Sequence, residues 1–394
     1  MTDVIRSRIS CTIGALMVTA IWPVGLYAQD DQAQDGGVTA SPTIITEASE
    51  AEAYWTQERF QEVVPLDLPT PEEPGPQGLP LGFELISPEL TTEIDTLEAG
   101  QEGSPPLVDP GEALSTTIAF DPDLSLDEEG GPSTEASSSF GAHFTTRQVP
   151  ATVEKSYPYR TVGKLFFRDS RRGTNHVCSA AVLRPRVVAT AGHCVTSPST
   201  NAADRYFFTN FLFVPSYNQG QAPYGRWTSS QQWVSNNWHF SNGSVPNRGD
   251  IAMLVMRDQE VRGTTQRIGA VTGWLGWRSN ALQQNHITML GYPCNLASCQ
   301  RMIETGAGTF SSGGQNTYTF GSSGRGGHSG GPFIQDFGVA PAGSPPASSG
   351  LNRLVGITSY GPTATEPKYL GASNFDNNFT SLLNSACNAS SGNC

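Results

Sequence analysis

Short runs of β-branched and aromatic residues, separated by turn-forming residues, recur from about residue 151 to the end of the chain. Such runs, bounded by Gly, Pro, Asn and Ser, predict many short strands. Helical spacing of apolar residues is scarce before residues 374–386, which predict one closing helix. The pattern indicates an all-β barrel or sandwich with a C-terminal helix. The predicted strands are TVGKLFF (161–167), VCSAAVL (177–183), VVATA (187–191), YFFTNFLFV (206–214), IAMLVM (251–256), HITMLGY (286–292), NTYTF (316–320) and RLVGITSY (353–360).

The first hydrophobic run of the chain, residues 9–26, has a different character. Arg6 and Arg8 precede it, and a small residue, Ala28, follows where a signal peptidase would cut, so residues 1–28 are interpreted as a secretory signal peptide. A transmembrane anchor is the alternative, which Pro23 and the absence of a cationic flank after the run disfavour. We therefore expect a secreted protein, extracellular or periplasmic, with no stable membrane anchor.

The 394 residues fall into two parts of opposite charge. Residues 29–150 hold 25 Asp and Glu against two Arg, a net charge of −23, whereas residues 151–394 hold 19 Lys and Arg against 10 Asp and Glu, a net charge of +9. The first part is rich in Pro, Ser and Gly, which predicts a largely disordered acidic region. Residues 45–64 lack Pro and Gly, however, and predict a helix presenting Trp55. Basic residues of the second part are dispersed rather than clustered with aromatic residues, which argues against nucleic-acid binding.

Six cysteines remain after the signal peptide, and in an exported protein they are expected to form disulfides. An even number fits three bridges, although the sequence alone allows many connectivities. A zinc site is the competing use, and the cysteine spacing differs from that of a typical tetrahedral site, so we expect no metal. Pairing of sequence neighbours joins Cys178 with Cys194, Cys294 with Cys299, and Cys387 with Cys394.

A candidate general base stands at the end of one predicted strand. In VVATAGHCV (187–195), His193 follows an apolar strand and adjoins Cys194, whose bridge to Cys178 on the neighbouring strand would hold the loop in place. A lone histidine is more often structural, so its partners decide the interpretation. Nucleophilic catalysis by serine needs such a base, a carboxylate that orients it, and backbone N–H groups that face the developing oxyanion.

The orienting carboxylate must lie where water does not compete for the imidazole hydrogen bond. Few acidic residues stand between His193 and Ser329, and of these Asp250 alone directly precedes a strand of buried character, in RGDIAMLVM (248–256). Asp250 is therefore the candidate. The alternative is a turn or helix cap, a common use of aspartate at such positions.

The stretch GRGGHSGGPF (324–333) supplies the candidate nucleophile. Its glycines let the backbone turn tightly and approach a substrate, so the N–H groups of Gly327 and Ser329 could converge on one oxygen. Gly/Ser-rich stretches also occur as plain linkers, and SSGG at 311–314 is interpreted as one. The order of the histidine, aspartate and serine segments, each beside a strand, is what indicates Ser329 as a nucleophile.

Together, TAGHC, GDIAML, GHSGGP and GITSYG resemble the signatures of the chymotrypsin-like serine endopeptidases, and LGYPCN (290–295) resembles the bacterial branch that includes the V8-type glutamyl endopeptidases. The resemblance runs from about residue 160 to residue 386. It implies an all-β double six-stranded β-barrel of the chymotrypsin type with the site between the barrels. It also implies that His193 is the general base, Asp250 its orienting group and Ser329 the nucleophile, with Gly327 and Ser329 as the oxyanion hole. The resemblance implies protein or peptide substrates and no cofactor, and we expect a monomer.

The same resemblance implies which residues contact the substrate. Ser323, at the base of the expected specificity pocket, is neutral, which disfavours cleavage after Lys or Arg. Thr358 stands where the V8-type enzymes carry a histidine. Arg325 and Lys368 near the pocket walls would favour an acidic residue before the scissile bond, but we expect an apolar preference ahead of an acidic one. The edge strand that pairs with the substrate backbone is implied to consist of Ser359, Tyr360 and Gly361.

The residue before the nucleophile departs from the pattern of the animal digestive enzymes. It is His328, where they carry an aspartate that receives the new N-terminal ammonium group after activation, and a neutral imidazole cannot anchor that charge in the same way. We therefore interpret Thr161 in YRTVGKLFF (159–167) as part of the first barrel strand rather than as an activation site.

Activation is assigned instead to residues 29–150, interpreted as a propeptide. Their negative charge would hold them against the catalytic domain, residues 151–394, until cleavage near residues 143–150. A solvating tail with no inhibitory role is the alternative. The leading function is thus a secreted serine endopeptidase made as an inactive or attenuated precursor. Its rival is a catalytically silent binding protein on the same scaffold, which the presence of all three triad residues disfavours.

Overall fold

The computed structural model describes residues 36–42, 48–71, 100–111, 114–117, 142–338, 351–365 and 368–394. The predicted signal peptide, residues 1–28, lies outside the described residues. Within the described ranges, no helix is both long enough and apolar enough to cross a membrane.

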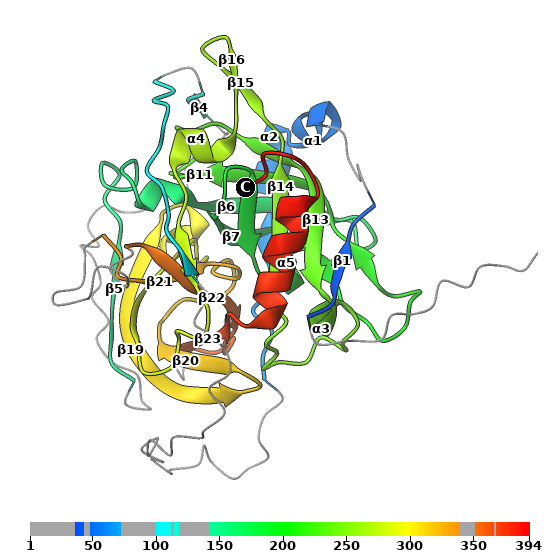
Figure 1. Ribbon diagram of the computed structural model, residues 1–394, viewed down its shortest axis with the longest axis vertical. Coiled ribbons are helices and arrows are strands. Elements are labelled where there is room, and N and C mark those ends of the chain that lie inside the picture. Colours follow the sequence, from blue (N-terminus) through cyan, green and yellow to red (C-terminus); the bar gives the residue numbers. More distant parts are fainter. Residues whose placement is uncertain are drawn as a thin grey trace, which may run out of the picture. The chain divides into compact units, whose positions relative to one another are not determined.

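The first barrel is a closed six-stranded antiparallel sheet, drawn mainly in green in Figure 1. The strand order is β13-β11-β6-β7-β8-β14, and a second pairing between β13 and β14 closes the ring. Every residue of β8 and β14 is buried, because both belong to the apolar runs that predicted them. The six strands are β6 (Val162–Asp169), β7 (Thr174–Val182), β8 (Val187–Thr190), β11 (Thr209–Pro215), β13 (Trp227–Ser235) and β14 (Ala252–Met256).

The second barrel repeats this construction in the C-terminal half. Its order is β21-β18-β19-β20-β23-β22, and β21 pairs with β22 to close it. Residues 311–314, interpreted from the sequence as a linker, are instead the end of the long strand β19, so that interpretation was wrong. The strands are β18 (His286–Gly291), β19 (Ile303–Gly314), β20 (Thr317–Gly321), β21 (Pro332–Gln335), β22 (Arg353–Tyr360) and β23 (Tyr369–Asn374). Two six-stranded barrels confirm the predicted architecture.

The predicted closing helix is present as α5 (Asn377–Asn388). The Asp376 side chain caps it by accepting a hydrogen bond from the Asn378 N–H, and the helix packs on β13 and β14 of the first barrel (Figure 1). Short helices and strands complete this part of the chain: α3 (Asn236–His239), α4 (Ile268–Thr272), η1 (Tyr159–Thr161), η2 (Gly192–Cys194), η3 (Ala297–Cys299), β9 (Thr196–Ser197), β10 (Tyr206–Phe207), β12 (Gln221–Ala222), β15 (Gln259–Val261), β16 (Thr264–Gln266) and β17 (Gly276–Arg278).

The acidic N-terminal segment, residues 29–150, contributes strands to the sheets of the domain. In order along the chain, its five strands pair with β13, β7, β17, β12 and β19. Within the described ranges, paired strands therefore replace the disorder predicted there, and the remaining residues of the segment lie outside the described residues. These strands are β1 (Val38–Ala40), β2 (Val64–Pro65), β3 (Gly100–Gln101), β4 (Thr116–Thr117) and β5 (Phe144–Gln148).

The helix predicted over residues 45–64 is broken into two, α1 (Ala48–Tyr54) and α2 (Gln57–Gln61). Trp55 lies at the break and is buried rather than presented to solvent. Its indole N–H donates to the Asn210 carbonyl at 2.7 Å, and its ring packs against Phe60 and Phe166. The tryptophan thus anchors the N-terminal segment to the first barrel.

The three disulfides join sequence neighbours. They are Cys178–Cys194, Cys294–Cys299 and Cys387–Cys394.

Candidate active site

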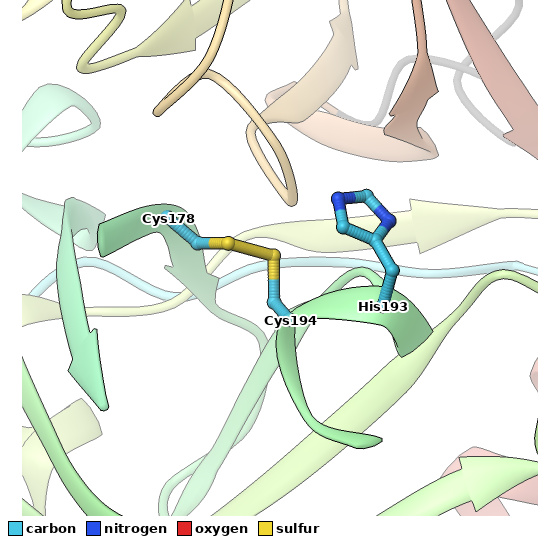
Figure 2. Close-up of side chains that lie close together, drawn as sticks. All are labelled: Cys178, His193 and Cys194. Atoms are coloured by element: carbon cyan, nitrogen blue, oxygen red, sulfur yellow. A yellow bond between two sulfur atoms is a disulfide. The ribbon is translucent and has the colours of Figure 1, made fainter. Parts of the chain in front are cut away.

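His193 lies in η2, the single turn that follows β8. The disulfide from Cys194 to Cys178 ties this turn to β7 (Figure 2). Gly192 is required here, because a Cβ at this position would lie 2.6 Å from the Trp238 ring. Although Cys178, His193 and Cys194 lie close enough together to suggest a metal site, both sulfurs are bonded to each other and offer no thiolate. The disulfide therefore fixes the backbone of the turn that carries the His193 imidazole.

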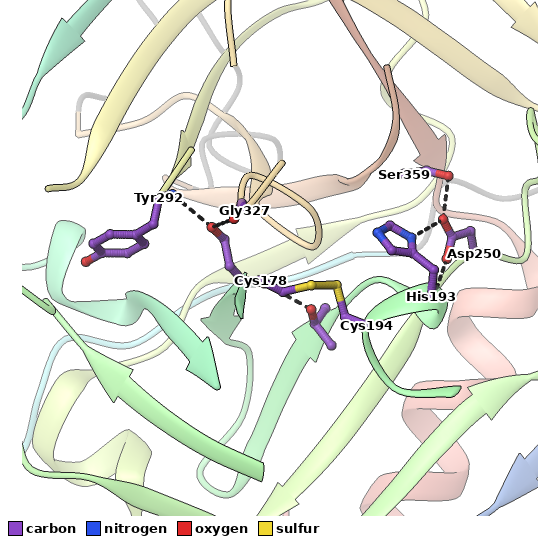
Figure 3. Close-up of a disulfide and its surroundings, with 9 residues drawn as sticks. Cys178, His193, Cys194, Asp250, Tyr292, Gly327 and Ser359 are labelled. Carbon is purple, nitrogen blue, oxygen red and sulfur yellow. Dashed lines mark hydrogen bonds and ion pairs between the residues drawn. A yellow bond between two sulfur atoms is a disulfide. The ribbon is translucent and has the colours of Figure 1, made fainter. Parts of the chain in front are cut away.

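Asp250 is fully buried just before β14 and binds the His193 turn through both carboxylate oxygens. Oδ2 lies 2.8 Å from His193 Nδ1, and Oδ1 accepts the His193 backbone N–H at 2.8 Å (Figure 3). Ser359 Oγ donates a third hydrogen bond to Oδ2 at 2.6 Å. These contacts fix the imidazole with Nδ1 toward the carboxylate, which leaves Nε2 to take part in chemistry.

Ser359 therefore has a contact that the sequence did not predict. The resemblance implied only that it belongs to the edge strand beside the substrate, and it does stand near the end of β22. Its side chain, however, bonds to Asp250, which is 109 residues away along the chain. No sequence spacing indicates such a contact, because it arises only when the two barrels meet.

Ser329 lies in the tight turn before β21, between two glycines with left-handed backbone. Gly327 has φ of 91° and Gly330 has φ of 75°, conformations that residues with a Cβ rarely adopt. At Gly330 a Cβ would also lie 2.0 Å from Thr190 Oγ1. The Ser329 carbonyl accepts the Ser179 N–H at 2.7 Å, which joins the turn to β7 of the first barrel.

Ser179 is a second residue that sequence reasoning missed. Its Oγ donates to the Gly327 carbonyl and accepts from the Tyr292 N–H, both at 2.9 Å (Figure 3). This hydrogen bond fixes the peptide between Gly327 and His328, whose N–H donates to the Arg325 carbonyl at 3.0 Å. Ser179 thus braces the candidate oxyanion donor.

The nucleophile and the base are not hydrogen-bonded to each other. Ser329 Oγ and His193 Nε2 are both buried, and neither has a hydrogen-bond partner among the described residues. Ser329 is 0% exposed in this arrangement. The Gly327 N–H donates at 3.3 Å to the carbonyl oxygen of Leu66, which belongs to the N-terminal segment.

His328 is buried beneath the nucleophile turn. Burial lowers the pKa of its imidazole to about 4, so the ring is neutral at neutral pH. Its Nδ1 lies 3.1 Å from Thr358 Oγ1, which itself donates to the Gly331 carbonyl at 3.0 Å, so the imidazole donates through Nδ1. Thr161, expected in the first barrel strand, is instead the last residue of η1, and β6 begins at the next residue, Val162.

The residues expected around the specificity pocket differ in what their side chains contact. Ser323 Oγ is buried, and no described residue is its hydrogen-bond partner. The Arg325 guanidinium donates to three backbone carbonyls, those of Gly324, Ala364 and Thr365, at 2.8 to 2.9 Å. Lys368 is partly buried just before β23. Arg325 therefore links its own loop to residues 361–365.

Near the end of β22, the side chain of Tyr360 faces the second barrel. Its hydroxyl lies 3.0 Å from Thr317 Oγ1, and Cβ atoms built at Gly313 and Gly371 would meet its ring and hydroxyl. Gly361, the next residue, donates its N–H to the Pro69 carbonyl at 3.2 Å. The expected edge strand thus offers backbone groups rather than side chains, and a residue of the N-terminal segment already uses one of them.

Comparisons with known proteins agree with this geometry. Residues 152–382 match the protein family described as Trypsin. The chain is similar to a glutamyl endopeptidase of Bacillus licheniformis, 22% identical over 203 residues, which are 47% of this chain and 59% of that protein. It is also similar to an extracellular metalloprotease of Bacillus subtilis, 25% identical over 164 residues, which are 41% of this chain and 46% of that protein. The chain thus spans less than two thirds of the length of either relative.

A solved structure of a thermostable serine protease from an extremophilic microorganism has the same fold. It aligns with a TM-score of 0.50 and 23% identity, over 61% of this chain and 100% of that one.

Proposed function

Because this chain belongs to the trypsin family, we propose that it is a serine endopeptidase that uses Ser329, His193 and Asp250. The observation that carries the proposal is the buried Asp250 carboxylate, which holds both the His193 backbone N–H and its Nδ1 at 2.8 Å. An imidazole oriented by a carboxylate and a serine in a glycine-rich turn are the groups that acyl transfer requires.

The proposed reaction follows from the positions of the donors. Ser329 Oγ attacks the substrate carbonyl while His193 Nε2 takes its proton, and Asp250 stabilises the imidazolium that forms. The Gly327 and Ser329 N–H groups receive the oxyanion, an interaction for which each donor contributes about 10²-fold or more to the rate in enzymes of this type. The imidazolium then protonates the leaving amine, and water releases the acyl group by the same route in reverse.

For the substrate, we propose that residues preceding the scissile bond lie along Ser359, Tyr360 and Gly361. The side chain of the attacked residue stays on the acyl part, so its pocket must adjoin this strand. Leu370 supports the assignment, because its side chain approaches both Gly324, beside Ser323, and Gly361. An apolar side chain against Leu370 is therefore the preferred occupant.

An acidic residue before the scissile bond is the second candidate, and the similarity to a glutamyl endopeptidase favours it. Arg325 and Lys368 would be its partners, although the guanidinium of Arg325 already donates to three carbonyls. A peptide library varied at this position separates the two. Cleavage after Leu and Phe supports the apolar pocket, and a preference for Glu that Lys368→Ala removes supports the cation.

Residues 29–150 are proposed to be a propeptide of a secreted precursor. The described contacts of this segment with the domain are mainly strand pairings and apolar packing, and the ion pair at Arg147 joins a segment cation to Glu304 of the domain. Release by cleavage near residues 143–150 would have to separate β5 from β19. N-terminal sequencing of the exported, processed protein would locate the boundary and also test the signal peptide.

Labelling with a fluorophosphonate tests the activity, because the reagent bonds to an activated serine and releases fluoride. We expect the processed wild-type protein to label and Ser329→Ala to remain unlabelled. A folded, processed wild type that does not label would favour the rival function, a binding protein without catalysis.

A further inference from the structure

Residues 64–69 of the N-terminal segment cross the candidate active site, and we call them the crossing segment. Three backbone hydrogen bonds hold it there. The Leu66 N–H donates to the Val177 carbonyl at 3.2 Å, the Gly327 N–H donates to the Leu66 carbonyl at 3.3 Å, and the Gly361 N–H donates to the Pro69 carbonyl at 3.2 Å. The crossing segment therefore spans from β7 of the first barrel, past the oxyanion donor, to the edge strand.

Buried apolar side chains also hold the crossing segment in place. Leu68 is only 3% exposed and packs with Leu370 in the second-barrel core. A Cβ built on Gly361 would lie 3.1 Å from both leucine side chains, so Leu68 stands beside the proposed specificity pocket. Pro65 and Asp67 lie against Gly326, two residues before His328. The crossing segment thus covers Gly326 and Gly327 of the turn that carries Ser329.

The direction of the crossing segment is opposite to that of the proposed substrate. In a substrate, residues before the attacked carbonyl lie along the edge strand, and the leaving peptide points away from it. Here the residues before the Leu66 carbonyl, Val64 and Pro65, pair in parallel with β7, and the residues after it run toward Gly361. The Leu66 carbonyl reaches the oxyanion donor, the Gly327 N–H. The residues before this carbonyl, however, lie on the side that the leaving peptide of a substrate would take, and the residues after it lie on the side of the acyl part.

Resting on the proposed function, we propose that the crossing segment is a built-in inhibitor that occupies the active site in reverse and escapes hydrolysis for that reason. For cleavage of the Leu66–Asp67 bond, His193 must protonate the departing Asp67 nitrogen. In this direction, however, that nitrogen lies on the edge-strand side, where the acyl part of a substrate would lie. Inhibition is then local and depends on Leu66 and Leu68 rather than on the overall negative charge of the segment.

The test measures fluorophosphonate labelling of Ser329 in the uncleaved full-length chain. Leu68→Asp places a carboxylate against Leu370, and Leu66→Pro removes the N–H that bonds to Val177. Each is expected to raise the labelling rate about tenfold or more over the wild type, because each raises the population with an open site. Leu114→Asp is the matched control, since Leu114 is also buried but packs against Gly225 of the first barrel, and it should label at the wild-type rate.

Intact mass spectrometry of the same samples tests the direction. We expect the Leu66–Asp67 bond to persist in the wild type as long as it does in Ser329→Ala. Cleavage at this bond in the wild type alone would overturn the reverse orientation. Near-UV circular dichroism identifies any variant that has lost its fold, and Leu68→Ser would then replace Leu68→Asp.

Equal labelling of the wild type, Leu68→Asp and Leu66→Pro would overturn the inference while leaving the proposed function standing, because Ser329 would still be reactive. Failure of every form to label, even after limited proteolysis has removed the N-terminal segment, would instead overturn the proposed function and the inference together.

Discussion

The candidate active site consists of a base half, formed by Asp250, His193 and Ser359, and a nucleophile half, formed by Ser329 and Gly327. The two halves differ in the hydrogen bonds that their residues make. In the base half, Asp250 makes hydrogen bonds to His193 twice and to Ser359 once, all at 2.6 to 2.8 Å. In the nucleophile half, Ser329 Oγ has no hydrogen-bond partner within the part of the chain that the structure describes, and the Gly327 N–H is already bonded to the Leu66 carbonyl. Both halves are assembled, but the backbone donor of the nucleophile half is already bonded to the crossing segment.

This difference bears on how the activity of the proposed precursor would be controlled. The residue before the nucleophile, His328, is neutral and already bonded to Thr358, so it does not wait for an incoming ammonium group. The left-handed backbone of Gly327 is also in place. Control is therefore expected to act through access to the site rather than through construction of the oxyanion hole.

Breaking the base half should have the largest effect. Asp250→Asn keeps the size of the side chain but cannot accept the Nδ1–H of His193 in the same way, so the imidazole loses its orientation. We expect kcat of the processed enzyme to fall about 10⁴-fold with little change in KM. Steady-state hydrolysis of a peptide substrate measures both. A loss of less than tenfold would mean that Asp250 acts only as a turn residue.

Substitution of His328 tests whether its imidazole, beneath the Ser329 turn, is neutral in the folded chain. Its pKa is about 4 in the folded chain and near the ordinary value of 6.5 when unfolded, so only the unfolded state takes up a proton between these values. The free energy of unfolding should therefore fall as the pH drops from 6.5 to 4, by about 3 kcal/mol in total from this residue. His328→Gln should lack this part of the slope, which urea unfolding at several pH values would reveal. Parallel pH profiles would show that His328 titrates normally in the folded chain.

Ser359→Ala should have the smallest effect. It removes one hydrogen bond to Asp250 and leaves the backbone of the edge strand unchanged. We expect kcat to fall about tenfold, the cost of one hydrogen bond to a charged group, with KM nearly constant. A rise in KM without a fall in kcat would assign the side chain to substrate binding instead, and Ser359→Thr, which keeps a hydroxyl, should restore part of the activity.

Much of the fold and the chemistry could be predicted from the sequence because the signals are local. The β-branched runs gave β6, β7, β8 and β14, and His193, Asp250 and Ser329 each lie beside a strand. Strand β19 was not predicted at all, since most of it, GAGTFSSGG, has no alternation of apolar residues. Its strand character comes from pairing with β5, β18 and β20, which no window of sequence displays.

The crossing segment could not be predicted at all. VPLDLP has the composition of an acidic, proline-rich linker, and its contacts use backbone N–H and carbonyl groups that every residue carries. The side-chain contacts of Ser179 and Ser359 could not be predicted for a different reason. Each depends on residues more than 100 positions away that the two barrels bring together.

The most direct test of a complete but covered active site compares hydrolysis of one peptide substrate by the uncleaved full-length chain and by the form from which the N-terminal segment has been removed. We expect removal to raise the rate about 100-fold or more, in low and in high salt alike, because strand pairing and leucine packing hold the segment in place. Equal rates for the two forms at low salt would contradict this expectation.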